Sequence, residues 1–137
     1  VAIDISRKII EVAKRISSNT LYIEDDFLNH DFGNLTFDGI FSKAFVHLFP
    51  KTDAVKVLRK MRNLISERGI VFIGTTIHDF SEEGYTEKSD YDNTVRFRRK
   101  WTRDELFDAV LNEEFKIFSE QENFESGKHW YGLILEK

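Results

Sequence analysis

The hydrophobic and polar positions alternate between short apolar runs and amphipathic stretches. Four runs predict strands, namely residues 1–5, 21–25, 37–42 and 70–76. Two stretches between them have apolar positions three and four residues apart, the spacing of a helix that buries one face. These positions are Ile9, Val12, Ala13 and Ile16 in the first, and Ala54, Val57, Leu58, Met61, Leu64 and Ile65 in the second. Strands alternating with helices predict an α/β fold with a mostly parallel sheet and right-handed crossovers.

The sequence also marks the limits of the second helix. Thr52 or Asp53 is a suitable N-cap, because a side-chain oxygen there accepts a hydrogen bond from the first turn. Gly69 follows the apolar stripe, so we expect the helix to close there. The strand that follows is continuously apolar, which is typical of a parallel strand covered on both faces.

The last part of the chain departs from this alternation. Residues 78–94 are polar, acidic and dotted with aromatic side chains, which predicts a loop or lid. Thr102 and Glu105 have the spacing of a capping box for a helix near 103–113. The segments 115–121 and 129–137 predict a closing antiparallel pair of strands.

Composition narrows the class of protein. The 137 residues suffice for one core, so we expect 1–137 to form a single domain. No apolar run approaches the roughly 18 residues of a membrane span, and the N-terminus lacks the order of a signal peptide, which favours a cytoplasmic location. The absence of cysteine excludes disulfides, and no histidine pair has metal-ligand spacing, so no metal is expected. A net charge of −4 argues against a broad nucleic-acid surface.

Candidate chemistry gathers after the predicted strands, where open parallel sheets bind ligands. The residues there are Asp4, Asp26 with Phe27, the segment 42–47 and the segment 75–78. A carboxylate at a strand end offers two acceptor oxygens to the two vicinal hydroxyls of a ribose. A second acid after the next strand can accept from the amino group of adenine, and a neighbouring aromatic ring can stack on the base. The pattern therefore predicts an adenosine site.

The order of segments resembles a class I methyltransferase that uses S-adenosylmethionine. "AIDISRKIIEVAK" (2–14) is similar to that family's second strand and helix, and "YIEDDF" (22–27) to its adenine-contacting turn. "FDGIFSKAFVHLFP" (37–50) is similar to its fourth strand and the loop after it. "LRKMRNLISERGIVFIGTT" (58–76) is similar to its fifth strand and the helix before it, although residues 66–69 replace the usual proline and paired glycines. The resemblance spans essentially the whole chain.

The resemblance implies a three-layer Rossmann-like fold and methyl transfer from S-adenosylmethionine to a small-molecule acceptor. It implies a cofactor site made of Asp4 and Ile5 at the ribose, Asp26 and Phe27 at the adenine, and Ser42 and Lys43 beyond the fourth strand. The acceptor side would involve His47, His78, Tyr85, Tyr91 and Arg98, with His47 as the catalytic candidate.

One departure from the family pattern is large. The family's first strand carries a glycine-rich turn, and the seven glycines here, at 33, 39, 69, 74, 84, 127 and 132, do not form one. That strand lies between the family's second and fourth strands, so its loss would leave open edges on both or force them together. We therefore expect that the chain lacks an N-terminal portion.

Ordinary structural roles compete with these assignments. Asp4 is placed to cap the following helix, the acids at 25 and 26 are candidate turn residues, and Phe27 is a core candidate. A lone histidine such as His47 is more often structural than catalytic. Methyl transfer depends mainly on alignment, and a base helps only if the acceptor loses a proton.

The segment before the last helix has two interpretations. "VRFRRKW" (95–101) predicts a strand with Arg96 and Arg98 on one side. In the simpler interpretation, this side is a charged face that pairs with the acidic loop. In the functional alternative, Arg96 or Arg98 binds a carboxylate or phosphate of the acceptor, and Tyr85 or Tyr91 packs on it from the lid.

Two other functions remain open on the sequence. The first is a non-catalytic module of the same fold that has lost the cofactor loop. The second is another nucleotide binder, such as a dehydrogenase in which Asp4 holds the ribose of NAD. The antiparallel ending disfavours the dehydrogenase.

Overall fold

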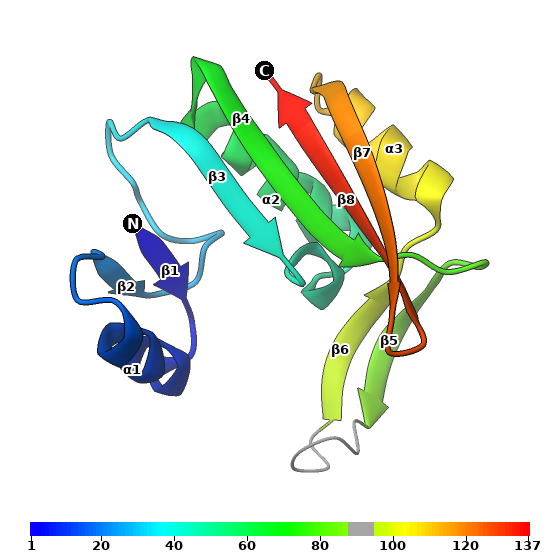
Figure 1. Cartoon of the computed structure of the whole chain (residues 1–137), viewed down its shortest axis with the longest axis horizontal. Coiled ribbons are helices and arrows are strands. Elements are labelled where there is room, and N and C mark those ends of the chain that lie inside the picture. Colours follow the sequence, from blue (N-terminus) through cyan, green and yellow to red (C-terminus); the bar gives the residue numbers. More distant parts are fainter. Residues whose placement is uncertain (88–94) are drawn as a thin grey trace. The chain divides into compact units, whose positions relative to one another are not determined.

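The computed structural model describes residues 1–87 and 95–137, so the predicted acceptor residue Tyr91 lies outside the described residues. The chain divides into two compact units, Val1–Leu35 and Thr36–Lys137, which are described in turn (Figure 1). None of the helices in the described ranges is long and apolar enough to cross a membrane.

The first unit is a βαβ motif, as the apolar pattern predicts. It consists of β1 (Ala2–Asp4), α1 (Arg7–Ile16) and β2 (Tyr22–Glu24), with the two strands parallel. The helix begins after Ser6, whose hydroxyl accepts a hydrogen bond from the Ile9 amide at 3.4 Å. The Tyr22 hydroxyl donates to the Ala13 carbonyl at 2.9 Å and so fastens the last turn of the helix to β2.

The apolar face predicted for α1 is not the buried one. Ile9, Val12 and Ile16 are 55%, 52% and 82% exposed, and the buried residue of the helix is Ile10. The reason is that two three-residue strands cover only the side of the helix that carries Ile10. The exposed stripe is of the kind that packs on a further element.

The second unit is built on a four-stranded sheet of order β3-β4-β8-β7. Its strands are β3 (Phe37–Lys43), β4 (Ile65–Thr76), β7 (Lys116–Glu125) and β8 (Lys128–Glu136), and its helices are α2 (Lys51–Leu64) and α3 (Arg103–Asn112), with a short 3₁₀ helix η1 (Val46–Leu48). β3 and β4 are parallel, and the pairs β4–β8 and β8–β7 are antiparallel. The predicted α/β class with an antiparallel C-terminal pair is confirmed.

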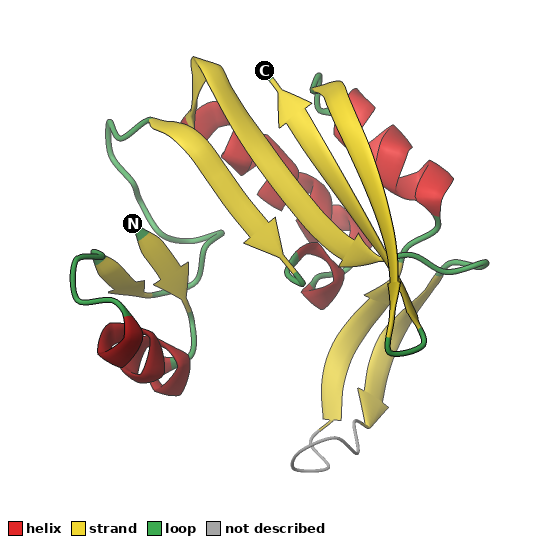
Figure 2. Ribbon diagram, in the orientation of Figure 1, coloured by secondary structure: helices red, strands yellow, loops and turns green. Residues whose placement is uncertain are grey.

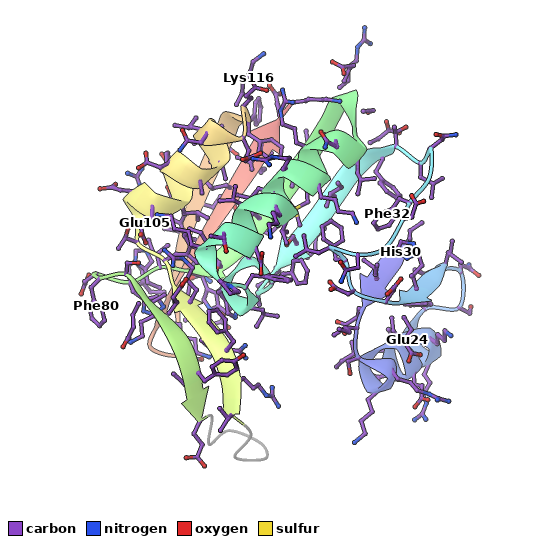
Figure 3. All side chains as sticks on the ribbon, turned by 180° about the vertical axis from the view of Figure 1, so that it is seen from behind. Glu24, His30, Phe32, Phe80, Glu105 and Lys116 are labelled. Carbon is purple, nitrogen blue, oxygen red and sulfur yellow. The ribbon has the colours of Figure 1, made fainter. Side chains whose placement is uncertain are left out.

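Both helices of this unit cover the same face of the sheet (Figure 2), and the view from behind places them in front of the strands (Figure 3). The core lies between these layers and includes Val71, Ile73, Leu133 and Leu135 from the sheet, all fully buried. On the other face Phe41 stacks on Phe72 with ring centroids 4.9 Å apart, and Phe41 is 74% exposed.

The predicted apolar stripe of α2 is confirmed, but its predicted limits are wrong. Pro50 rather than Thr52 or Asp53 precedes the helix, and the chain passes directly from Leu64 into β4 at Ile65. Gly69 therefore lies in a strand. Gly69 is buried there. A Cβ at this position would lie 2.4 Å from Cγ1 of Ile65 and 3.0 Å from the Phe37 carbonyl oxygen, so glycine is needed for close packing and does not end a helix.

β1 and β3 belong to separate sheets in the described ranges. β1 has β2 as its strand partner and β3 has β4, so each has one edge without a strand partner among the described residues.

Residues 82–87, which belong to the segment predicted as a loop or lid, form a strand instead. β5 (Glu82–Glu87) and β6 (Val95–Lys100) pair antiparallel in a two-stranded arm, because Tyr85, Val95 and Phe97 supply the β-forming side chains. The closing strands β7 and β8 are longer than predicted and meet at Ser126 and Gly127, whose φ values of 52° and 72° are those of a two-residue hairpin turn.

The predicted cap of α3 can be tested directly. The Thr102 hydroxyl accepts from the Glu105 amide at 3.2 Å, so Thr102→Ala is expected to lower the free energy of unfolding by about 1 kcal/mol. Thr52→Ala is the control, because Thr52 is exposed in the first turn of α2 and does not cap that helix. Urea unfolding of both variants measures the difference, and equal losses would contradict the assigned cap.

Candidate functional site

Asp4 lies at the carboxyl end of β1, beside the acids that end β2. Asp4 and Glu24 are paired in register, and the Asp25 amide donates to the Asp4 carbonyl oxygen at 3.2 Å. The Oδ1 atom of Asp4 accepts from the Ser6 amide at 2.7 Å, which fixes the direction of the carboxylate. The other oxygen, Oδ2, has no hydrogen-bond donor among the described residues. Because Ser6 caps α1, the interpretation of Asp4 as the helix cap is wrong.

Asp26 shapes the turn that follows β2. Its Oδ1 accepts from the Leu28 amide at 2.9 Å, and its Oδ2 accepts from the Asn29 side-chain amide at 2.6 Å. The interpretation of Asp26 as a structural residue of the turn is therefore confirmed. Each carboxylate oxygen has a second acceptor position, so a hydrogen bond to the adenine amino group stays a prediction.

The neighbouring Phe27 and Ile5 differ in exposure. Phe27 is partly buried and its ring lies 5.9 Å from that of the buried Phe32, which His30 contacts from the edge at 4.7 Å. Ile5, the residue after Asp4, is 75% exposed. Stacking of either side chain on a bound nucleoside stays a prediction.

In the second unit, Ser42 and Lys43 end β3 and point to opposite faces of the sheet. Ser42 is buried, and its hydroxyl has no hydrogen-bond partner among the described residues. The Lys43 ammonium lies 5.1 Å from the centre of the Trp130 ring. The next residue, Ala44, turns the chain with a left-handed φ of 57° and donates its amide to the Gly74 carbonyl at 2.7 Å, so β3 and β4 end side by side.

The two histidines predicted at the acceptor side both follow these strand ends. His47 on η1 has its Nδ1 3.3 Å from the hydroxyl of the buried Thr75. His78 has its Nε2 3.3 Å from the Thr76 hydroxyl, and its amide donates to the Trp101 carbonyl. Partial burial, helped by the charge of Lys100, holds the pKa of His78 below its usual value. The lowered pKa favours the neutral imidazole, which is the form that can accept a proton.

The arm carries the remaining predicted residues. Tyr85 on β5 is 76% exposed and meets the Phe97 ring edge to face at 5.6 Å. Arg98 on β6 is half-buried. The predicted strand with Arg96 and Arg98 on one side is confirmed by the β5–β6 pairing.

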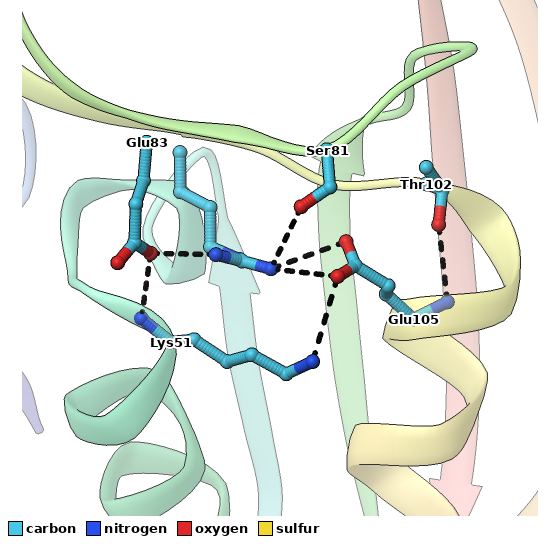
Figure 4. Close-up of polar contacts among 6 residues, drawn as sticks. Lys51, Ser81, Glu83, Thr102 and Glu105 are labelled. Atoms are coloured by element: carbon cyan, nitrogen blue, oxygen red, sulfur yellow. Dashed lines mark hydrogen bonds and ion pairs between the residues drawn. The ribbon is translucent and has the colours of Figure 1, made fainter.

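The sequence did not lead us to Arg99, the most buried charged side chain of the arm. Figure 4 shows the polar contacts among Lys51, Ser81, Glu83, Thr102 and Glu105 around it. Arg99 is 4% exposed and contacts Glu83 at 2.5 Å, Glu105 at 3.1 Å and the Ser81 hydroxyl at 3.2 Å. Lys51, the first residue of α2, donates its amide to Glu83 and its ammonium to Glu105. This cluster fastens the arm to the first turns of α2 and α3.

A signal for Arg99 was present in the sequence. In a strand over 95–100, Arg99 lies two residues after Phe97 and four after Val95, so the three side chains share one face. An arginine on an apolar face requires a carboxylate partner. Burial acts to raise the pKa of Glu105, but the Ser81 hydrogen bond and the charges of Arg99 and Lys51 outweigh it and hold that pKa below its usual range.

Within the described ranges, no group of three or more histidine, aspartate and glutamate side chains is arranged to hold a metal ion. Candidate residues follow strand ends in each of the two units. The first unit contributes Asp4 and the turn at 25–27, and the second contributes the ends of β3 and β4 with the arm.

Comparisons with known proteins identify the family and the fold of this chain. The profile of a methyltransferase domain family matches residues 1–69, half of the chain. The chain belongs to this methyltransferase domain family. A comparison with curated proteins finds no match.

Solved structures share the fold. An S-adenosylmethionine-dependent methyltransferase from Methanosarcina mazei superposes with a TM-score of 0.84 at 11% identity, over 98% of this chain and 80% of that one. A second from Clostridium acetobutylicum gives 0.76 at 12% identity, over 98% and 73%. The 1,6-didemethyltoxoflavin-N1-methyltransferase of Burkholderia thailandensis, solved with 1,6-didemethyltoxoflavin and S-adenosylhomocysteine, gives 0.76 at 18% identity. The chain covers 60% of that enzyme's length, and 99% of the chain is matched.

Proposed function

We propose that this chain supplies the adenosine-binding and acceptor-side parts of an enzyme that transfers a methyl group from S-adenosylmethionine to a small molecule. The observation that carries the proposal is the Asp4 carboxylate, which is oriented by the Ser6 amide and has an oxygen without a donor, at the end of a parallel strand. A ribose diol supplies the two donors that such a carboxylate accepts.

The acceptor side would be formed by the ends of β3 and β4 and by the arm. Transfer from a sulfonium needs the acceptor atom held in line with the methyl group, and positioning is the main source of rate. In this proposal, His47 or His78, which follow the ends of β3 and β4, removes a proton from an oxygen or nitrogen acceptor. The Burkholderia relative, with its bound small molecule, supports a small acceptor over a macromolecule.

A binding experiment on the full-length protein tests this function. We expect saturable binding of S-adenosylhomocysteine by calorimetry and no displacement of it by NAD. A methyl-labelled donor should then pass its label into the low-molecular-mass fraction of a cell extract rather than into protein. Failure of the folded, full-length protein to bind S-adenosylhomocysteine would favour the non-catalytic module, and displacement by NAD would favour a dehydrogenase.

A further inference from the structure

One face of β6 carries three cationic side chains, and Arg98 and Lys100 differ in what lies opposite them on β5. Arg96, Arg98 and Lys100 alternate with Arg99 and so share the face opposite to it. Lys100 pairs with Glu82 directly across the arm at 2.5 Å. Opposite Arg98 lies Gly84, which has no side chain to offer.

Arg98 is a half-buried cation without a carboxylate partner among the described residues. Its Nη1 donates to the Phe97 carbonyl of its own strand at 3.1 Å. Burial, reinforced by the charge of Arg96, lowers the pKa of Arg98, so both influences disfavour the positive charge. A half-buried guanidinium beside a second one is stabilised by an anion that accepts its remaining N–H groups.

The strand that carries Arg98 contacts the segments that follow the strand ends assigned to the acceptor. β6 packs against η1, which carries His47. Trp101, the residue after β6, forms a β-bridge with Ile77, the residue after β4. The His78 amide donates to the Trp101 carbonyl oxygen at 2.8 Å. Lys100, on the same face of β6 as Arg98, is close enough to His78 for its charge to lower that residue's pKa.

We propose that the methyl acceptor carries a carboxylate or phosphate group and that Arg98 binds this oxyanion through its guanidinium fork. The inference rests on the proposed function, since it assigns the acceptor of the same site. A guanidinium matches two oxygens of either group with parallel hydrogen bonds, which an ammonium cannot do. The acceptor is therefore an organic acid or a phosphate ester, and its anionic group sets its orientation toward the methyl donor.

The test uses small probes on the full-length protein in the presence of S-adenosylhomocysteine. Benzoate and phenyl phosphate represent the two oxyanions, and benzyl alcohol is the neutral analogue. Binding is followed by calorimetry and by the NMR signal of the Arg98 Nε–H group. Arg98→Gln removes the fork, Arg98→Lys keeps the charge without it, and Arg68→Gln is the control, because Arg68 is an exposed arginine near the start of β4.

We expect at least one oxyanion to bind saturably and to shift the Arg98 signal, while benzyl alcohol does neither. Arg98→Gln should weaken that binding by more than about tenfold and Arg98→Lys should recover only part of it, whereas Arg68→Gln should leave it unchanged. Absence of oxyanion binding, or equal binding by Arg98→Gln and wild type, overturns the inference. S-adenosylhomocysteine binding, measured separately, reports on the proposed function, so the two failures are distinguishable.

Discussion

Arg99→Met is expected to lower the free energy of unfolding by about 3 kcal/mol, because it removes the buried cation that two carboxylates share. Arg99 is 4% exposed, and Glu83 and Glu105 both contact it (Figure 4). Methionine fills much of the same volume, so the loss reports on charge more than on packing. Urea unfolding of the purified protein measures the effect.

Lys56→Met is the matched control for this prediction. Lys56 also pairs with a carboxylate, that of Asp53 at 2.7 Å, but its side chain is 63% exposed. An exposed pair three residues apart on a helix contributes little, so we expect a change of less than about 0.5 kcal/mol. A loss no larger in Arg99→Met than in Lys56→Met would mean that the cluster does not hold the arm on α2 and α3.

The second large effect is expected on cofactor affinity. Asp4→Ala should weaken the binding of S-adenosylhomocysteine by roughly 100-fold, since it removes charged hydrogen bonds to the ribose. Asp4→Asn should fall between alanine and wild type, because an amide oxygen still accepts one hydrogen bond but the amide nitrogen does not. Calorimetric titration of the full-length protein gives all three affinities.

Asp31→Ala is the control for losing the local hydrogen bond between the Asp4 carboxylate and a backbone amide. Asp31 also accepts an amide two residues ahead, that of Gly33 at 2.7 Å, as Asp4 accepts that of Ser6 at 2.7 Å. The two substitutions remove the same local hydrogen bond in the same unit, so only a ligand contact separates them. Asp31→Ala should bind S-adenosylhomocysteine as wild type does, and equal losses in the two variants would assign the effect of Asp4 to folding.

The apolar pattern predicted the parts of the fold whose burial is decided locally. The α2 stripe from Ala54 to Leu64 is buried because both its helix and the sheet beneath it lie in the same unit. The ends of β1 and β2 could be predicted as neighbours because parallel strands joined by a crossover align their carboxyl ends. Asp4 beside the acids at 24–26 follows from that alignment.

Other features depend on contacts that periodicity does not report. Gly69 resembles a helix terminator, but the closeness of the Ile65 side chain and of the Phe37 carbonyl oxygen is what favours glycine there. The exposure of Ile9 and Ile16 depends on the area of sheet that packs on α1. The sequence of the helix itself does not report that area. Arg99 was missed because its partners Glu83 and Glu105 are brought to it by the arm and by α3.

The position of the ribose in a crystal structure of the full-length protein with bound S-adenosylhomocysteine tests the central claim most directly. We predict that both ribose hydroxyl oxygens lie about 2.7 Å from the carboxylate oxygens of Asp4. A ribose bound to other groups, with the Asp4 carboxylate directed away from the nucleoside, would contradict the account.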